Sequence, residues 1–187
     1  ARETPFSFGS RYTVLGEIAR GGMASILKVR DEDFQRLLAM KVVPCGGKAG
    51  ASDPGEAARL YRFLTEARIT AQMDHHGVVP VHDIGVNSDG DVYFTMGLIQ
   101  GSDLAEIIQL ARRNQQGWDL RRALEVIIKV CETVGHAHSR GVIHRDLKPA
   151  NVMVGKFDQV YVMDWGLAKV RGRSDPCDLR ARWEGGG

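Results

Sequence analysis

The stretch that decides the interpretation of this chain is HRDLKPAN at His144–Asn151, which is followed by DWG at Asp164–Gly166. It combines carboxylates, a lysine and an amide in a fixed order, and such groups can neutralise phosphate charge and hold Mg²⁺ through oxygen atoms. Pro149 fixes its own φ angle and disfavours helix at the preceding residue, so we expect a rigid loop here. A lone aspartate and asparagine in a loop would be solvated turn residues, but the long ordered pattern favours a catalytic site.

The chemistry of these side chains indicates phosphoryl transfer. Such a reaction gives a protein little covalent work, because catalysis consists mainly of positioning and of neutralising charge on the phosphate oxygens. Asp146 would accept or orient the proton of an attacking hydroxyl, and Lys148 would steady the γ-phosphate. Asn151 and Asp164 would hold the metal through side-chain oxygens.

These two segments resemble the catalytic and metal-binding segments of protein kinases, specifically the eukaryotic-like Ser/Thr kinases found in bacteria. The resemblance covers roughly residues 10–172. It implies a Ser/Thr protein kinase that uses ATP with Mg²⁺, or Mn²⁺, and acts on a protein Ser or Thr. Lys148 favours a Ser/Thr enzyme, because Tyr-specific relatives usually differ at this place. Trp165 replaces the more usual Phe, and we expect it to pack beneath the helix that carries Glu66.

The upstream half of the chain carries the partners that such a site needs. Leu38–Val43 (LAMKVV) is an apolar run with one lysine, as expected of a strand buried on both faces that delivers the Lys41 ammonium to the α- and β-phosphates. A buried lysine needs a counter-charge. Glu66 lies in a predicted helix from residue 54 or 56 to 73 and, taken alone, would be a solvated helix residue. Its place after the lysine strand favours a Lys41–Glu66 ion pair.

The segment expected to cover the phosphates is less typical. Gly21 and Gly22 resemble the glycine-rich loop of the family, in which glycines let backbone N–H groups approach a nucleotide. Ala19 and Ala24 replace two of the usual glycines and narrow the backbone freedom of the loop, which leaves the affinity for ATP open; a plain hairpin turn is the alternative. The resemblance implies that the nucleotide is also contacted by Ile26, Ala39, Lys41, Met96, Gly97, Ile99 and Met153.

The resemblance implies an α+β, two-lobed protein-kinase-like fold, with a small antiparallel sheet and one helix above an incomplete, mainly helical lower lobe. The expected parts are an extension (1–9), an upper lobe (10–96), a hinge (97–101), a partial lower lobe (102–170) and the disordered start of an activation segment (171–187). Ser102 is the expected N-cap of a short helix. A longer helix is expected to bury one face, which makes Cys131 a core thiol; this face consists of Leu120, Leu124, Ile127, Cys131, Val134 and His138.

Composition limits the remaining possibilities. The 187 residues are 43% hydrophobic and 26% charged, as is ordinary for a globular protein. No apolar run reaches membrane-spanning length, and a net charge of +2 is too small to indicate nucleic acid as a partner. The three cysteines show no metal or disulfide spacing, which favours the cytoplasm. No zinc site is expected at His75 and His76, because no ligand lies at suitable spacing.

Three interpretations remain open at this stage. The first is a Ser/Thr protein kinase, present here as a domain truncated within its activation segment, since Ala1 is not Met and no Ala-Pro-Glu motif follows Asp164. The second is a pseudokinase or regulatory module that binds a nucleotide without turnover. The third is an inactive fragment that self-associates through apolar surfaces of its incomplete lobe.

Overall fold

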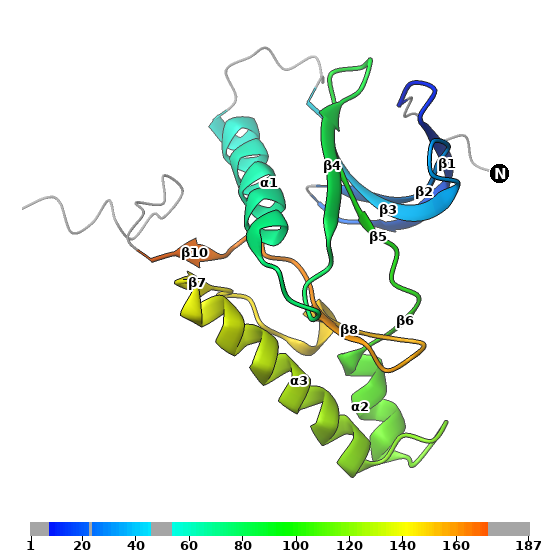
Figure 1. Ribbon diagram of the computed structural model, residues 1–187, viewed down its shortest axis with the longest axis vertical. Coiled ribbons are helices and arrows are strands. Elements are labelled where there is room, and N and C mark those ends of the chain that lie inside the picture. Colours follow the sequence, from blue (N-terminus) through cyan, green and yellow to red (C-terminus); the bar gives the residue numbers. More distant parts are fainter. Residues whose placement is uncertain (1–7, 23, 46–53, 172–187) are drawn as a thin grey trace, which may run out of the picture.

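The computed structural model describes residues 8–22, 24–45 and 54–171. The described chain forms two parts, an upper sheet with one helix against it and a lower part dominated by two helices (Figure 1). This arrangement confirms the expected two-lobed α+β fold. Among the described residues, no helix is both long and apolar enough to cross a membrane.

The upper part is an antiparallel sheet with strand order β1-β2-β3-β5-β4. The strands are β1 (Tyr12–Arg20), β2 (Ser25–Asp31), β3 (Arg36–Val43), β4 (Val81–Val86) and β5 (Val92–Gly97). Because side chains alternate along a strand, β3 sends Met40 into one hydrophobic cluster and Ala39 into another on the opposite face. The expected burial of this strand on both faces is confirmed.

Helix α1 (Pro54–Gln72) packs on the face of the sheet that Ala39 occupies. Phe63 contacts Phe94 of β5 with ring centroids 5.0 Å apart, and Ala67 lies in the same cluster. The predicted bounds of this helix were correct to within a few residues. Its last turn and the residue after it, Met73, join a second core below the sheet. Helix α1 therefore connects the two parts.

The lower part is built from short strands around two helices. Its elements are β6 (Gly101–Asp103), α2 (Leu104–Arg112), α3 (Leu120–Ser139), β7 (Val142–Ile143), the 3-10 turn η1 (Pro149–Asn151), β8 (Val152–Gly155), β9 (Val160–Val162) and β10 (Lys169–Val170). Strands β6, β8 and β9 form one antiparallel sheet, and β7 pairs with β10. Trp165 is 1% exposed in the core beneath them, together with Ile69 of α1, as expected.

The segment between β5 and α2 differs from the prediction in the residue that caps the start of α2. Ser102 is not an N-cap, because it belongs to β6 and pairs with Val154. Asp103 caps α2 instead, with its Oδ1 accepting from the backbone N–H of Glu106 at 2.8 Å. A side chain at Gly101 would collide with the backbone of Val154, so the close approach of β6 and β8 requires glycine here.

The prediction for α3 selected the wrong face. The residues that α3 buries are Ala123, Val126, Val130, Thr133 and Ala137. Leu120 is 70% exposed and Cys131 is exposed, so Cys131 is not a core thiol. The sequence of α3 carries two apolar stripes at helical spacing. Periodicity alone does not tell which of the two stripes is buried against the rest of the described chain.

Candidate active site

The predicted catalytic residues meet in a cleft between the sheet, α1 and the loops below. Two adjoining cavities, of about 540 Å³ and 330 Å³, occupy this cleft. Lys41, Glu66 and Asp164 contribute to the walls of both. The cavity of about 540 Å³, called the outer cavity below, is also lined by Gly21, Gly22 and Asp146. The cavity of about 330 Å³, called the inner cavity, is also lined by Asn151 and Met153.

Lys41 and Glu66 form the ion pair that their order along the chain predicts. Lys41 Nζ donates to both carboxylate oxygens of Glu66 at 2.7 Å, and Asp164 Oδ1 lies 3.8 Å from the same ammonium. The side chains of Lys41 and Glu66 are only 17% and 11% exposed. Burial raises the pKa of the Glu66 carboxyl, and the adjacent ammonium opposes that shift. The pair therefore fixes α1 to β3 beside the cleft.

The loop of residues 144–151 holds its carboxylate with two donors. Lys148 Nζ donates to Asp146 Oδ2 at 2.8 Å, and Asn151 Nδ2 donates to the same oxygen at 3.1 Å. The Lys148 contact is the main reason that the pKa of Asp146 lies below its ordinary value. Asp146 is thus ionised at neutral pH and can accept a hydrogen bond from a hydroxyl. In the same contact Asp146 raises the pKa of Lys148, which keeps the cation charged.

His144 joins this loop to the segment before Asp164, a role that sequence reasoning did not identify. Its Nδ1 accepts from the backbone N–H of Asp146 at 3.2 Å, so Nε2 carries the proton of the neutral ring and donates to Met163 O at 2.9 Å. The ring is 3% exposed and packs on Trp165 with centroids 4.5 Å apart. The only signal in the sequence was its place at the start of the pattern.

Two residues of the site have backbone φ angles that residues other than glycine rarely adopt. Arg145 has φ of 67° and Asp164 has φ of 61°, both in the left-handed region. Gly166 follows closely, and a Cβ atom there would lie 3.3 Å from Glu66 Oε2 and 3.4 Å from Asp164 Oδ1. The absence of a side chain at Gly166 therefore lets α1 and the Asp164 segment approach each other.

Two side chains have the character expected of magnesium ligands. Asn151 uses its amide nitrogen for contacts to Asp146, which leaves its Oδ1 as the atom for a cation, and the Asp164 side chain is 50% exposed to the cleft. Their loops are joined because the backbone N–H of Met163 donates to Asn151 O at 2.8 Å. No group of three or more His, Cys, Asp or Glu side chains converges on a point within the described ranges. This small set of hard oxygens fits Mg²⁺, which usually takes its other ligands from phosphates and water.

The two alanines of the glycine segment fit without backbone strain. Ala19 lies in β1 opposite Ile26 of β2, so it is part of the ladder rather than the turn. The turn is closed by the backbone N–H of Gly21, which donates to Ala24 O at 2.9 Å. Neither alanine has a positive φ. The affinity for ATP, which the sequence left open, is therefore not lowered by backbone strain at these two alanines.

The residues expected around a nucleotide base are only partly brought together. Met96, Met153 and Ile26 line the inner cavity. Gly97 and Ile99 line a separate hollow of about 400 Å³, and the backbone N–H of Gly97 donates to Pro80 O at 3.2 Å, so this N–H is not available to a base. Ala39 is 5% exposed in the core behind the cleft, and neither cavity has it among its lining residues.

Comparison with known proteins gives consistent matches. The family model described as Protein kinase domain matches residues 12–180. A serine/threonine-protein kinase PknD of Protochlamydia amoebophila is 34% identical over 180 residues, which cover 91% of this chain and 17% of that protein. The PknD proteins of Chlamydia trachomatis serovar D and Chlamydia felis are 36% identical over 166 and 165 residues, covering 84% of this chain and 17% of theirs. The chain thus spans 17% of the length of these relatives.

Proposed function

The chain belongs to the protein kinase family, with Ser/Thr kinases among its relatives, and on that premise we propose that it transfers the γ-phosphoryl group of ATP to a Ser or Thr hydroxyl of a protein. One observation carries this proposal. Asp146 with its two donors lines the same cavity as the Lys41–Glu66 pair and Asp164. A scaffold protein would not need this many polar groups suited to one reaction.

Each group has a defined task in the proposed reaction. The attacking hydroxyl oxygen forms a bond to the γ-phosphorus while the bond to the bridging oxygen of ADP breaks, and Asp146 accepts the hydroxyl proton or orients it. Lys148, held 2.8 Å from Asp146, places positive charge beside the transferred group. Lys41 neutralises the remaining phosphates, and Glu66 holds its ammonium in place. Mg²⁺, held by Asn151 and Asp164, would supply charge neutralisation on the phosphate oxygens.

The direct test is transfer of radiolabelled phosphate from ATP to a generic protein substrate. We expect Asp146→Asn and Lys41→Met to abolish transfer, whereas the exposed matched controls Asp89→Asn and Lys156→Met keep it within about twofold. Activity that survives both changes in the cleft would refute the assignment of these residues. Phosphate recovered only on Tyr would refute the Ser/Thr specificity.

A nucleotide-binding module without turnover is the second candidate. Ala19 and Ala24, which stand where the family usually has glycine, motivate it. A thermal shift with ATP that depends on Mg²⁺, in a chain that transfers no phosphate, would select this alternative. A chain that shows both the shift and transfer is the kinase.

Self-association is a third property that the structure supports. Helix α3 exposes Leu120, Leu124 and Ile128 at 70%, 53% and 58%, and contiguous exposed apolar side chains of this kind mark interaction surfaces. Light scattering after size exclusion should show a mass above that of a monomer, and Leu124→Glu should decrease that mass.

Cys45 and Cys131 are free thiols, which fits the reducing cytoplasm that we propose as the location.

A further inference from the structure

The wall that α1 contributes to the outer cavity carries two arginines to which the proposed reaction assigns no task. Arg59 and Arg62 line this cavity, together with Glu66 on the same helix. Because these three positions are three and four residues apart, they share one face of α1. Neither arginine lines the inner cavity, which Met96 lines. The two cations therefore belong to the outer part of the cleft, which Asp146 also lines.

Neither arginine has a counter-ion within the described residues. Both are half-buried, and no described carboxylate forms an ion pair with Arg59 or Arg62. Nε of Arg59 is buried and has no hydrogen-bond partner in that part of the chain. A cation that is partly removed from water without a partner costs free energy, and an anion beside it offsets that cost. This wall of the cavity therefore favours an anionic occupant.

The three carboxylates that line the outer cavity lie beside lysines rather than beside these arginines. Glu66 accepts from Lys41 Nζ at 2.7 Å, and Asp164 lies 3.8 Å from the same ammonium. Asp146 accepts from Lys148 Nζ at 2.8 Å. The positive charge on the α1 wall is thus left for a ligand.

The place of the arginines favours the protein substrate as that ligand. In the proposed reaction the attacking hydroxyl meets Asp146, so the segment that carries the hydroxyl enters the outer cavity. Asp146 and both arginines line this one cavity, and a residue three places from the hydroxyl lies about 10 Å from it in an extended chain. A guanidinium binds a carboxylate or a phosphate through two parallel N–H donors. An oxyanion close to the reacting residue matches this wall.

We propose that Arg59 and Arg62 select protein substrates that carry an anionic residue, a carboxylate or a phosphorylated side chain, within a few places of the reacting Ser or Thr. Selection of this kind rests on the proposed function, because it defines the substrate class of the same site. Binding of an anionic peptide is nevertheless measurable without any transfer of phosphate.

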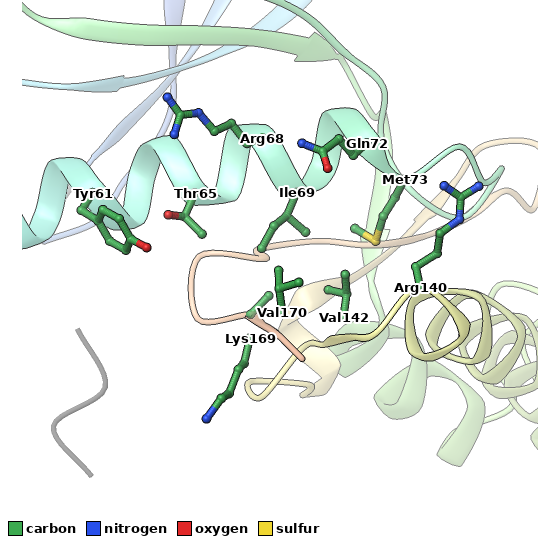
Figure 2. A pocket seen from close by; sticks show the side chains of 11 residues that line it. Tyr61, Thr65, Arg68, Ile69, Gln72, Met73, Arg140, Val142, Lys169 and Val170 are labelled. Carbon is green, nitrogen blue, oxygen red and sulfur yellow. The ribbon is translucent and has the colours of Figure 1, made fainter. Parts of the chain in front are cut away.

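Arg68 provides a matched control on the same helix. It lies two residues after Glu66, and residues two apart do not share a face of a helix. It lines a separate cavity of about 330 Å³ formed by α1, the β7–β10 ladder and the end of α3 (Figure 2). Arg68 is exposed and lines neither cavity of the cleft. A change at Arg68 therefore removes the same charge from α1 at a distance from the proposed site.

The binding test uses fluorescence anisotropy of labelled peptides with the 187-residue chain, with Ala in place of the reacting residue. The peptides carry Glu, phosphoserine or Gln at the second and third places on each side of this Ala. We expect the Glu or the phosphoserine peptide to bind about tenfold tighter than the Gln peptide, and the tighter of the two identifies the anion. Arg59→Gln combined with Arg62→Gln should reduce this ratio to about twofold, whereas Arg68→Gln leaves it unchanged.

Circular dichroism checks the fold of the double variant. If the double variant does not fold, Arg62→Gln alone takes its place and should lower the ratio by about threefold. The kinetic test uses the same peptides with Ser in place of Ala. The anionic peptide should have a kcat/KM about tenfold higher, through its KM, and the double change should remove this difference without altering the KM for ATP.

Three results would overturn this substrate site. They are equal binding of the anionic and Gln peptides, an equal loss in Arg68→Gln and the double variant, or weaker ATP binding in the double variant with an unchanged peptide ratio. The last result would assign the arginines to the nucleotide. A chain that binds the anionic peptide through the arginines but transfers no phosphate refutes only the proposed function. Equal transfer to the anionic and Gln peptides refutes selection by charge and leaves the proposed function in place.

Discussion

The Lys41–Glu66 pair gives the sharpest prediction, because its geometry sets a magnitude. In Glu66→Gln the Lys41 ammonium keeps one neutral acceptor in place of a carboxylate that it contacts twice at 2.7 Å. Removing one partner of a fully buried pair costs about 3–5 kcal/mol. These side chains are 17% and 11% exposed, and Asp164 at 3.8 Å offers partial compensation. We therefore expect a loss of about 2–3 kcal/mol in the free energy of unfolding.

The measurement is a double-mutant cycle of Lys41→Met and Glu66→Gln, followed by urea unfolding. We expect a coupling energy of about 1.5–3 kcal/mol and, for Glu66→Gln alone, a Tm lower by about 4–12 °C. The control pair is Arg121–Glu125 on α3, which is 87% and 53% exposed and should couple by about 0.3–0.5 kcal/mol. If both pairs couple equally weakly, the burial argument for Lys41 and Glu66 is wrong.

Three further predictions concern Gly166, His75 and Cys131. Gly166→Ala should lower kcat/KM by about tenfold with little loss of stability, because the added methyl group lies 3.3 Å from Glu66 Oε2; steady-state kinetics that match the unmodified chain would contradict this. Burial and two neighbouring imidazoles lower the pKa of His75. The unfolded chain then binds more protons, so stability is fully present above about pH 6.5 and falls as the pH decreases below that value. The urea midpoint should decrease less steeply from pH 7.5 to pH 5.5 in His75→Gln than in the unmodified chain. An identical slope in the two chains would refute the assignment of this pH dependence to His75. Cys131 should react with a thiol reagent in the native state at a rate close to that of a free cysteine, and protection until unfolding would show that its face of α3 is covered.

Much of the fold and of the site was predictable because local patterns carry it. The apolar run around Lys41 predicts a strand buried on both faces, and β3 has that environment. The order of Lys41, Glu66 and the HRDLKPAN segment predicts which groups share a cleft, and the ion pair and the donors to Asp146 agree.

Other features depend on contacts that no local pattern specifies. The first residue of α2 is set by the pairing of Ser102 with Val154, which left Asp103 as the cap. The N–H of Gly97 is taken by Pro80, a residue distant in sequence. In both cases a partner from another segment decided between local alternatives of similar free energy.

The sequence by itself determined the proposed chemistry, because residue types and their spacing define which groups are suited to phosphoryl transfer. Only the tertiary structure decided how those groups are held. It placed His144 as the link between the loops of Asp146 and Asp164, buried one stripe of α3 while exposing Cys131, and formed a cavity beneath α1 from three separate segments. The physical reason is that burial, tautomer and pKa depend on neighbours that meet only when distant segments pack together.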